Sequence, residues 1–139
     1  MCATRIRTGA LSGSSPESVN VKSAKAKAES SVDLAHQTCR PCEGGTQPIA
    51  ESEIRKKLKR LSGWSYEKGE ITKTFSFKNY YETTAFVQAV AWIAHREDHH
   101  PEIEFGYKRC RVRYVTHAIG GISENDFICA AKVDALLQT

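Results

Sequence analysis

The amino-acid sequence predicts an α+β domain in which a four-stranded antiparallel sheet carries three helices on one face. Three observations support this fold class. The periodicity of apolar residues gives the order helix, strand, strand, helix, strand, strand, helix. Short turns rather than crossovers join each pair of strands, and every Trp, Tyr and Phe lies at or after Trp64. We therefore expect residues 48–139 to form one domain, residues 37–47 to be a linker and residues 1–36, rich in Ser, Ala and Lys, to be a disordered tail.

The first half of the domain contains a predicted helix and a predicted hairpin. Apolar residues recur at helical spacing in residues 51–62, and Gly63 favours the end of that helix. Residues 64–77 are typical of a hairpin with its turn at Lys68-Gly69, because glycine adopts the positive φ that tight turns require.

The next helix is the most apolar part of the chain. Asn79 is its expected N-cap, and residues 85–94 are apolar around most of the helix circumference. Pro101 disfavours helical geometry in the residue before it, so it is expected to end the helix. One sheet face cannot cover so much apolar surface in a small domain, and this indicates that the helix also contacts a second copy of the chain.

The last three elements follow from the same patterns. Alternating apolar residues predict strands over 103–107 and 110–114. After the break at Gly120-Gly121, Ser123 is expected to cap a final helix that extends to about residue 137, with Asp126 in the capping-box position.

Composition excludes several classes of function. The net charge is only +4, and the basic cluster in residues 55–60 has no interleaved aromatic residues, which disfavours a nucleic-acid surface. No apolar run is long enough for a membrane span.

The odd cysteine count and the lack of a hydrophobic signal peptide favour the cytoplasm, although residues 1–36 also suit a transit peptide to a mitochondrion or plastid. Cys39 and Cys42 form a lone C-x-x-C, which we interpret as two linker thiols because zinc needs further ligands.

Four of the five histidines lie between residues 95 and 117. His95 and His99 are four residues apart at the end of the apolar helix and are predicted to share a face. His100 lies at the junction of helix and strand, and His117 ends a strand. Histidines gathered at the ends of separate elements indicate a site for proton transfer. Zinc binding by His95, His99 and His117 is an alternative, since H-x-x-x-H is a known ligand spacing.

These residues resemble the motif of a known enzyme family. The run His95-Arg96-Glu97-Asp98-His99-His100-Pro101, followed by Tyr107, Thr116-His117 and Asp126, resembles the pterin-4a-carbinolamine dehydratases. Residues 91–94 and 120–132, and also residues 39–45, resemble the bacterial-like branch of that family. The resemblance covers about residues 34–139. One departure is His95, where many members have Glu.

The resemblance implies the fold described above, assembled as a homodimer or homotetramer. It implies a hydro-lyase that removes water from 4a-hydroxytetrahydrobiopterin, the product of an aromatic amino acid hydroxylase, with no cofactor and no metal. Animal members of the family also serve as dimerisation partners of a homeodomain transcription factor. That role is a further alternative, and no residue of this chain supports it.

The resemblance also implies roles for individual residues. His99 and His117 would form the acid/base pair, with the order of the two roles left open. His100 would mainly bind the substrate. The remaining residues of the expected substrate pocket are His95, Pro101, Tyr107 and Asp126. Asp126 equally suits two positions, as the partner of a helix N-cap or as the group that orients a histidine.

Overall fold

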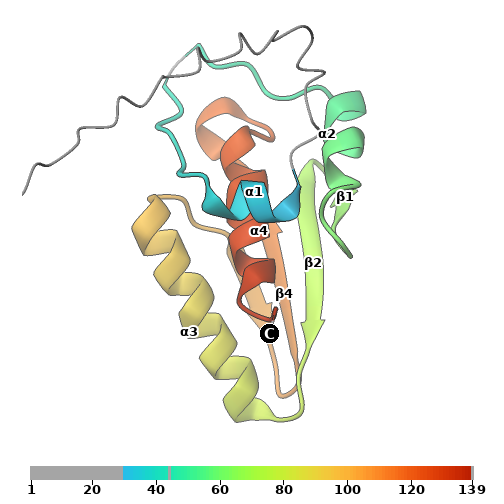
Figure 1. Ribbon diagram of the computed structural model, residues 1–139, viewed down its shortest axis with the longest axis vertical. Helices are drawn as coiled ribbons and strands as arrows, with labels where there is room; N and C mark the ends of the chain where they lie inside the picture. Colours follow the sequence, from blue (N-terminus) through green and yellow to red (C-terminus); the bar gives the residue numbers. More distant parts are fainter. Residues whose placement is uncertain (1–29, 44, 139) are drawn as a thin grey trace, which may run out of the picture.

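The computed structural model describes residues 30–43 and 45–138. Its four strands form one antiparallel sheet in the order β1-β2-β4-β3, so the predicted fold class is confirmed. Figure 1 shows the helices in front of this sheet. The elements are α1 (Ser31–His36), α2 (Glu51–Leu58), β1 (Ser65–Glu67), β2 (Glu70–Ser76), α3 (Tyr80–Glu97), β3 (Glu102–Phe105), β4 (Arg109–Tyr114), the 3-10 helix η1 (His117–Ile119) and α4 (Glu124–Ala135).

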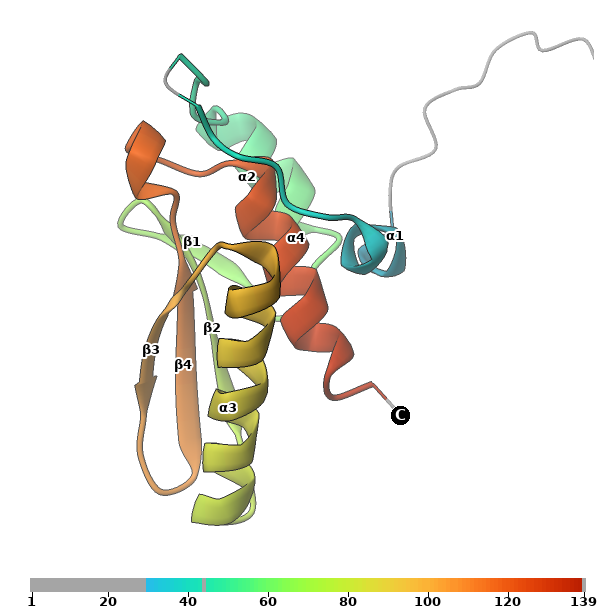
Figure 2. The same cartoon turned by 90° about the vertical axis from the view of Figure 1, so that its left-hand side faces the viewer.

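The helices all lie on one face of the sheet, as Figure 2 shows. Alternation along β2 and β4 gives this face its apolar side chains, and Ile71, Val112 and Tyr114 are completely buried there. Helix α4 crosses the middle of this layer, and residues 125–131 are buried without a break. Because α4 is covered on both sides, the polar residues in this buried stretch lie in an environment with little water, where they need hydrogen-bond partners.

Helix α3 buries a narrower stripe than its composition suggests. Thr83, Phe86 and Val90 are buried, whereas the Trp92 side chain on another face of the helix is 61% exposed. In a single copy of the chain, the sheet thus covers only part of the apolar surface of α3, and the predicted contact with a second copy stays a prediction. The apolar residues that the sheet does not cover remain open to solvent or to another protein surface. No helix in the described ranges is long and apolar enough to span a membrane.

Residues 31–36 contradict the prediction of a disordered tail, because they form α1 and pack against α4. Ser30 and Asp33 make a capping box that satisfies the first turn. Leu34 is only 1% exposed and belongs to the hydrophobic core. A helix this short needs one apolar anchor and leaves no periodic pattern for sequence analysis to detect. Residues 1–29 of the predicted tail lie outside the described residues.

Candidate active site

Three separate segments, together with Asn125 of α4, line a cavity of about 560 Å³ at one end of the sheet. The first is residues 38–42, which belong to the expected linker and which we call the strap. The second is residues 96–100 at the end of α3, and the third is residues 115–118 after β4. The cavity has the size of a small-molecule site. It brings together His99, His100 and His117, as the sequence predicted.

A left-handed residue places His99 at this cavity. Helix α3 ends at Glu97, and Asp98 adopts φ 50° and ψ 40°. The backbone N–H of His99 then donates to the carbonyl of Ala94 (3.2 Å), a bond that closes the helix end. Because the chain has left the helix, His99 does not share a helical face with His95, and that prediction is wrong. The left-handed residue Asp98, and not Pro101 as predicted, therefore ends the helix.

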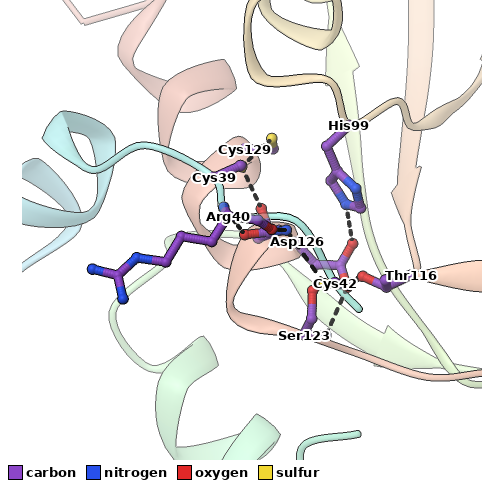
Figure 3. A network of polar contacts seen from close by, with 9 residues as sticks. Cys39, Arg40, Cys42, His99, Thr116, Ser123, Asp126 and Cys129 are labelled. Carbon is purple, nitrogen blue, oxygen red and sulfur yellow. Dashed lines mark hydrogen bonds and ion pairs between the residues drawn. The ribbon is translucent and has the colours of Figure 1, made fainter. Parts of the chain in front are cut away.

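The carboxylate of Asp126 holds His99 from below, as Figure 3 shows. Its Oδ1 lies 2.6 Å from Nε2 of His99, and its Oδ2 accepts hydrogen bonds from Thr116 Oγ1 (2.8 Å) and the backbone N–H of Ser123 (2.9 Å). Thr116 and Ser123 also share a hydrogen bond between their hydroxyls (2.6 Å). Asp126 is completely buried, so it lies behind His99 rather than in the cavity wall. It acts both as the capping-box partner of α4 and as the partner of a histidine.

This arrangement favours one tautomer of the His99 ring. When the Asp126 carboxylate accepts this hydrogen bond, Nε2 is the donor and Nδ1 is left for a bound molecule. The ring also lies nearly parallel to that of Tyr114, at an interplanar angle of 12° and a centroid distance of 5.8 Å. Burial, together with the nearby Cys129, Asp126 and Cys39, raises the pKa of the Tyr114 phenol, which stays protonated.

The other two histidines are presented differently. His117 is the first residue of η1. Thr116 and Gly121, on either side of η1, form an isolated antiparallel bridge that holds the short helix in place. Gly120 has φ 66°, a conformation that glycine adopts without strain. The His117 and His100 side chains are exposed, and neither ring makes a hydrogen bond within the described part of the chain. Both are free to meet a molecule in the cavity.

Two side chains fasten the strap over this site. Asn125 of α4 accepts a hydrogen bond from the Arg40 N–H (3.0 Å) and donates one to the Arg40 carbonyl (2.6 Å). Glu97 accepts the backbone N–H of Cys39 (2.8 Å) and pairs with Lys132 (3.2 Å). Burial opposes ionisation of Glu97, but the hydrogen bonds from Cys39 and Lys132 outweigh it and lower its pKa. Residues 38–42 of the expected linker are therefore a wall of the site rather than a loose connection.

The remaining predicted site residues do not meet at this cavity. Pro101 follows His100 but is not among the lining residues. His95 is exposed on α3 beside Trp92, with 5.3 Å between the ring centroids. Tyr107 lies in the turn between β3 and β4 and stacks on Tyr80, the first residue of α3, whereas His99 follows the other end of that helix. Figure 2 shows the turn between β3 and β4 beside the start of α3. In one copy of the chain, neither His95 nor Tyr107 is placed to bind the same molecule as His99.

The zinc alternative also lacks its ligand set. The proposed ligand His95 is separated from His99 and His117, and no group of three or more His, Cys, Asp or Glu residues that could hold a metal occurs in residues 30–43 and 45–138. Asn125, Thr116 and Glu97 lie within the segments that carry the resemblance, but the sequence analysis gave them no structural role, because their partners are distant in the chain. The resemblance in residues 39–45 was the one signal that could have indicated the strap.

Comparison with known proteins agrees with this geometry. The model of the family described as Pterin 4 alpha carbinolamine dehydratase matches residues 47–136. A Nitrosospira multiformis protein, provisionally named pterin-4-alpha-carbinolamine dehydratase, is 61% identical over 106 residues, which are 76% of this chain and 94% of that protein. A Nitrosomonas europaea protein with the same name is 59% identical over 108 residues, or 77% and 96% of the two chains. The crystal structure of a transcriptional coactivator/pterin dehydratase from Brucella melitensis has a TM-score of 0.64 and 33% identity, and the match covers 66% of this chain and all of that one.

Proposed function

Because this chain belongs to the pterin 4 alpha carbinolamine dehydratase family of hydro-lyases, we propose that it removes water from 4a-hydroxytetrahydrobiopterin to give quinonoid dihydrobiopterin. An aromatic amino acid hydroxylase would supply the substrate, and a reductase would consume the product. The observation that carries the proposal is the meeting of His99 and His117, from separate segments, at one cavity above a buried carboxylate.

The chemistry requires two proton transfers. The reaction breaks the bond between carbon 4a and its hydroxyl oxygen, and hydroxide is a poor leaving group. An acid must protonate that oxygen, the lone pair of a neighbouring ring nitrogen expels water, and a base removes a proton from a ring nitrogen. Imidazole can serve in either role near neutral pH. We assign the two transfers to His99 and His117.

The surrounding residues support different parts of this reaction. Asp126 favours one tautomer of His99. Its carboxylate also stabilises the positively charged imidazolium, which is the form of His99 before it donates a proton or after it accepts one. His100, exposed at the rim, would bind the substrate. The strap would cover the bound pterin from the side opposite to residues 115–118. No step requires a metal or redox cofactor.

One assay tests the proposal. The 4a-hydroxypterin is generated with a hydroxylase, and its decay is followed with and without the full-length protein. The wild type should accelerate the decay, a His99→Ala/His117→Ala double variant should not, and incubation with a chelator should leave the wild-type rate unchanged. Absence of acceleration by the folded wild type would reject the proposed activity. Activity lost to the chelator and restored by zinc would reject the histidine mechanism.

The open face of α3 supports a second proposal, that the protein is a homodimer or homotetramer. Trp92 on this helix and Phe105 on the edge strand β3 are 61% and 48% exposed, and a small domain has a limited core of its own. Sedimentation of the wild type should give a species larger than a monomer at micromolar concentration. A single monomeric species would contradict this proposal. A Trp92→Lys variant should dissociate more readily than the wild type if α3 lies in the interface.

A further inference from the structure

Two cysteines from distant parts of the chain meet beside the cavity. The Sγ atoms of Cys39 in the strap and Cys129 in α4 are 3.5 Å apart, although 90 residues separate them in sequence. Both are free thiols. Figure 3 shows Cys39 and Cys129 together. The pair is close to the bonds that fasten the strap, because Glu97 accepts the backbone N–H of Cys39 and Asn125 binds the next residue.

The two thiols differ in access. Cys39 is partly exposed and lines the cavity, so a small molecule that enters the cavity reaches it. Cys129 is completely buried. Its hydrogen bond with Cys39 and its burial raise the pKa of the Cys129 thiol, which therefore stays protonated. The geometry gives Cys39 the role of the first group to be oxidised and Cys129 that of the second.

We propose that Cys39 and Cys129 form a peroxide-sensitive thiol pair whose disulfide fastens the strap to α4 and fixes one wall of the cavity. The Cys39 thiolate attacks hydrogen peroxide, an S–O bond forms, the O–O bond breaks, and the released hydroxide takes a proton to become water. The Cys129 sulfur then attacks the Cys39 sulfenic acid. The S–S bond forms, the S–O bond breaks, and hydroxide leaves with the Cys129 proton as a second water. Two electrons pass from the two thiols to one peroxide.

The required movement is small. The sulfurs must approach from 3.5 Å to about 2.05 Å, and the polar contacts of the strap already hold Cys39 against α4. The C-x-x-C partner Cys42 has a different contact, since its sulfur accepts a hydrogen bond from the Asn125 side chain (3.4 Å). The structure therefore favours the distant cysteine over the one that is near in sequence. The new bond would close a loop of 90 residues, which should stabilise the fold appreciably.

Peptide mapping and thermal unfolding of the full chain test this inference without any measurement of turnover. The background carries Cys2→Ser, and the protein is treated with hydrogen peroxide, with or without later reduction by dithiothreitol. We expect a Cys39–Cys129 cross-link as the main product, and a melting temperature higher by about 5 °C or more that dithiothreitol reverses.

Matched variants separate the pair from its neighbour. Each variant is compared with its own reduced form, so that a loss of stability from the substitution itself does not obscure the result. Cys42→Ser should keep both the cross-link and the rise in melting temperature, whereas Cys39→Ser, Cys129→Ser and Cys129→Ala should lose both. A Cys39–Cys42 bond as the main product, sulfinic acid on Cys39 without a cross-link, or a cross-linked protein with an unchanged melting temperature would overturn the inference.

Discussion

The two sides of the cavity present their histidines in opposite ways. The His99 side chain is only 12% exposed and is bound to the buried Asp126, whereas His117 is exposed and its ring makes no hydrogen bond within the described residues. One of the two histidines that we propose as proton-transfer groups is thus held in place by the interior of the domain, and the other is free to adjust to a bound molecule. Substitutions on the buried side should therefore change folding and turnover together, and those on the open side should change turnover alone.

The largest expected effect is a loss of turnover, and we expect it for the histidine on either side of the cavity. His99→Ala and His117→Ala should each slow dehydration about a hundredfold or more, the usual scale for a lost acid or base. Chemical unfolding should then separate the two variants. His99→Ala leaves a buried carboxylate short of one partner and should cost about 1–3 kcal/mol, whereas His117→Ala should stay within about 0.5 kcal/mol of wild type. A near-normal rate in either folded variant would remove that residue from the mechanism.

The next effect concerns Asp126. Asp126→Asn keeps the shape but replaces an acceptor of three hydrogen bonds, so it should lower the free energy of unfolding by about 2–4 kcal/mol. It should also lower kcat at least about tenfold, because His99 loses the tautomer that the carboxylate imposes.

Asp134→Asn is the matched control. Asp134 is the other buried carboxylate of α4, and it binds Trp64 (3.0 Å) and Lys73 (2.7 Å) at the end of the helix away from the cavity. This control should lose stability and keep the wild-type kcat. If both variants lost activity equally, the effect of Asp126 would be one of general stability.

A smaller effect is expected from the strap, the third wall of the cavity. Asn125→Ala removes both hydrogen bonds to the Arg40 backbone and should cost about 1–2 kcal/mol. Steady-state kinetics should show KM raised severalfold with kcat little changed, because we propose that the strap covers the substrate and takes no part in proton transfer. The adjacent Glu124→Ala, which removes a partly exposed ion pair with Lys57, should change neither constant. An Asn125→Ala variant with unaltered KM would show that the strap does not contact the substrate.

The smallest effect depends on pH. The pKa of Glu97 is lowered in the folded protein, so its contribution to stability is present above its ordinary value of 4.5 and is lost as the pH falls through the lower folded value. Urea unfolding should show wild type more stable than Glu97→Gln at pH 7, with the difference reduced at pH 3.5. An equal difference at both pH values would mean that the charge of Glu97 does not hold the strap.

The sequence predicted the sheet and most helices well, because periodic apolar residues encode them directly. The glycine of Lys68-Gly69 and the Ser123–Asp126 spacing also correctly predicted the hairpin turn and the capping box of α4. It predicted the convergence of His99, His100 and His117 through their placement at element ends. The end of α3 was harder to predict, since the left-handed residue is Asp98 rather than a glycine.

The strap and its fastening could not be predicted from local patterns. Its contacts come from single residues with distant partners, such as Cys39, which meets Glu97 and Cys129, 58 and 90 residues away. Composition correctly marked the segment as poor in large apolar groups, but a short segment needs few of them when side chains from α3 and α4 satisfy its backbone. Tyr107 shows the converse, because a family pattern in sequence did not bring it to the cavity in one copy of the chain.

We propose that Asp126 acts on catalysis through His99, and a double-mutant cycle in the dehydration assay tests this role most directly. Rates are measured for wild type, Asp126→Asn, His99→Ala and the combined variant under conditions where all four are folded. If Asp126 serves to orient His99, its substitution should have almost no further effect once His99 is absent. If Asp126→Asn lowers the rate by the same factor with and without His99, the two residues act independently and the account of the buried side is contradicted.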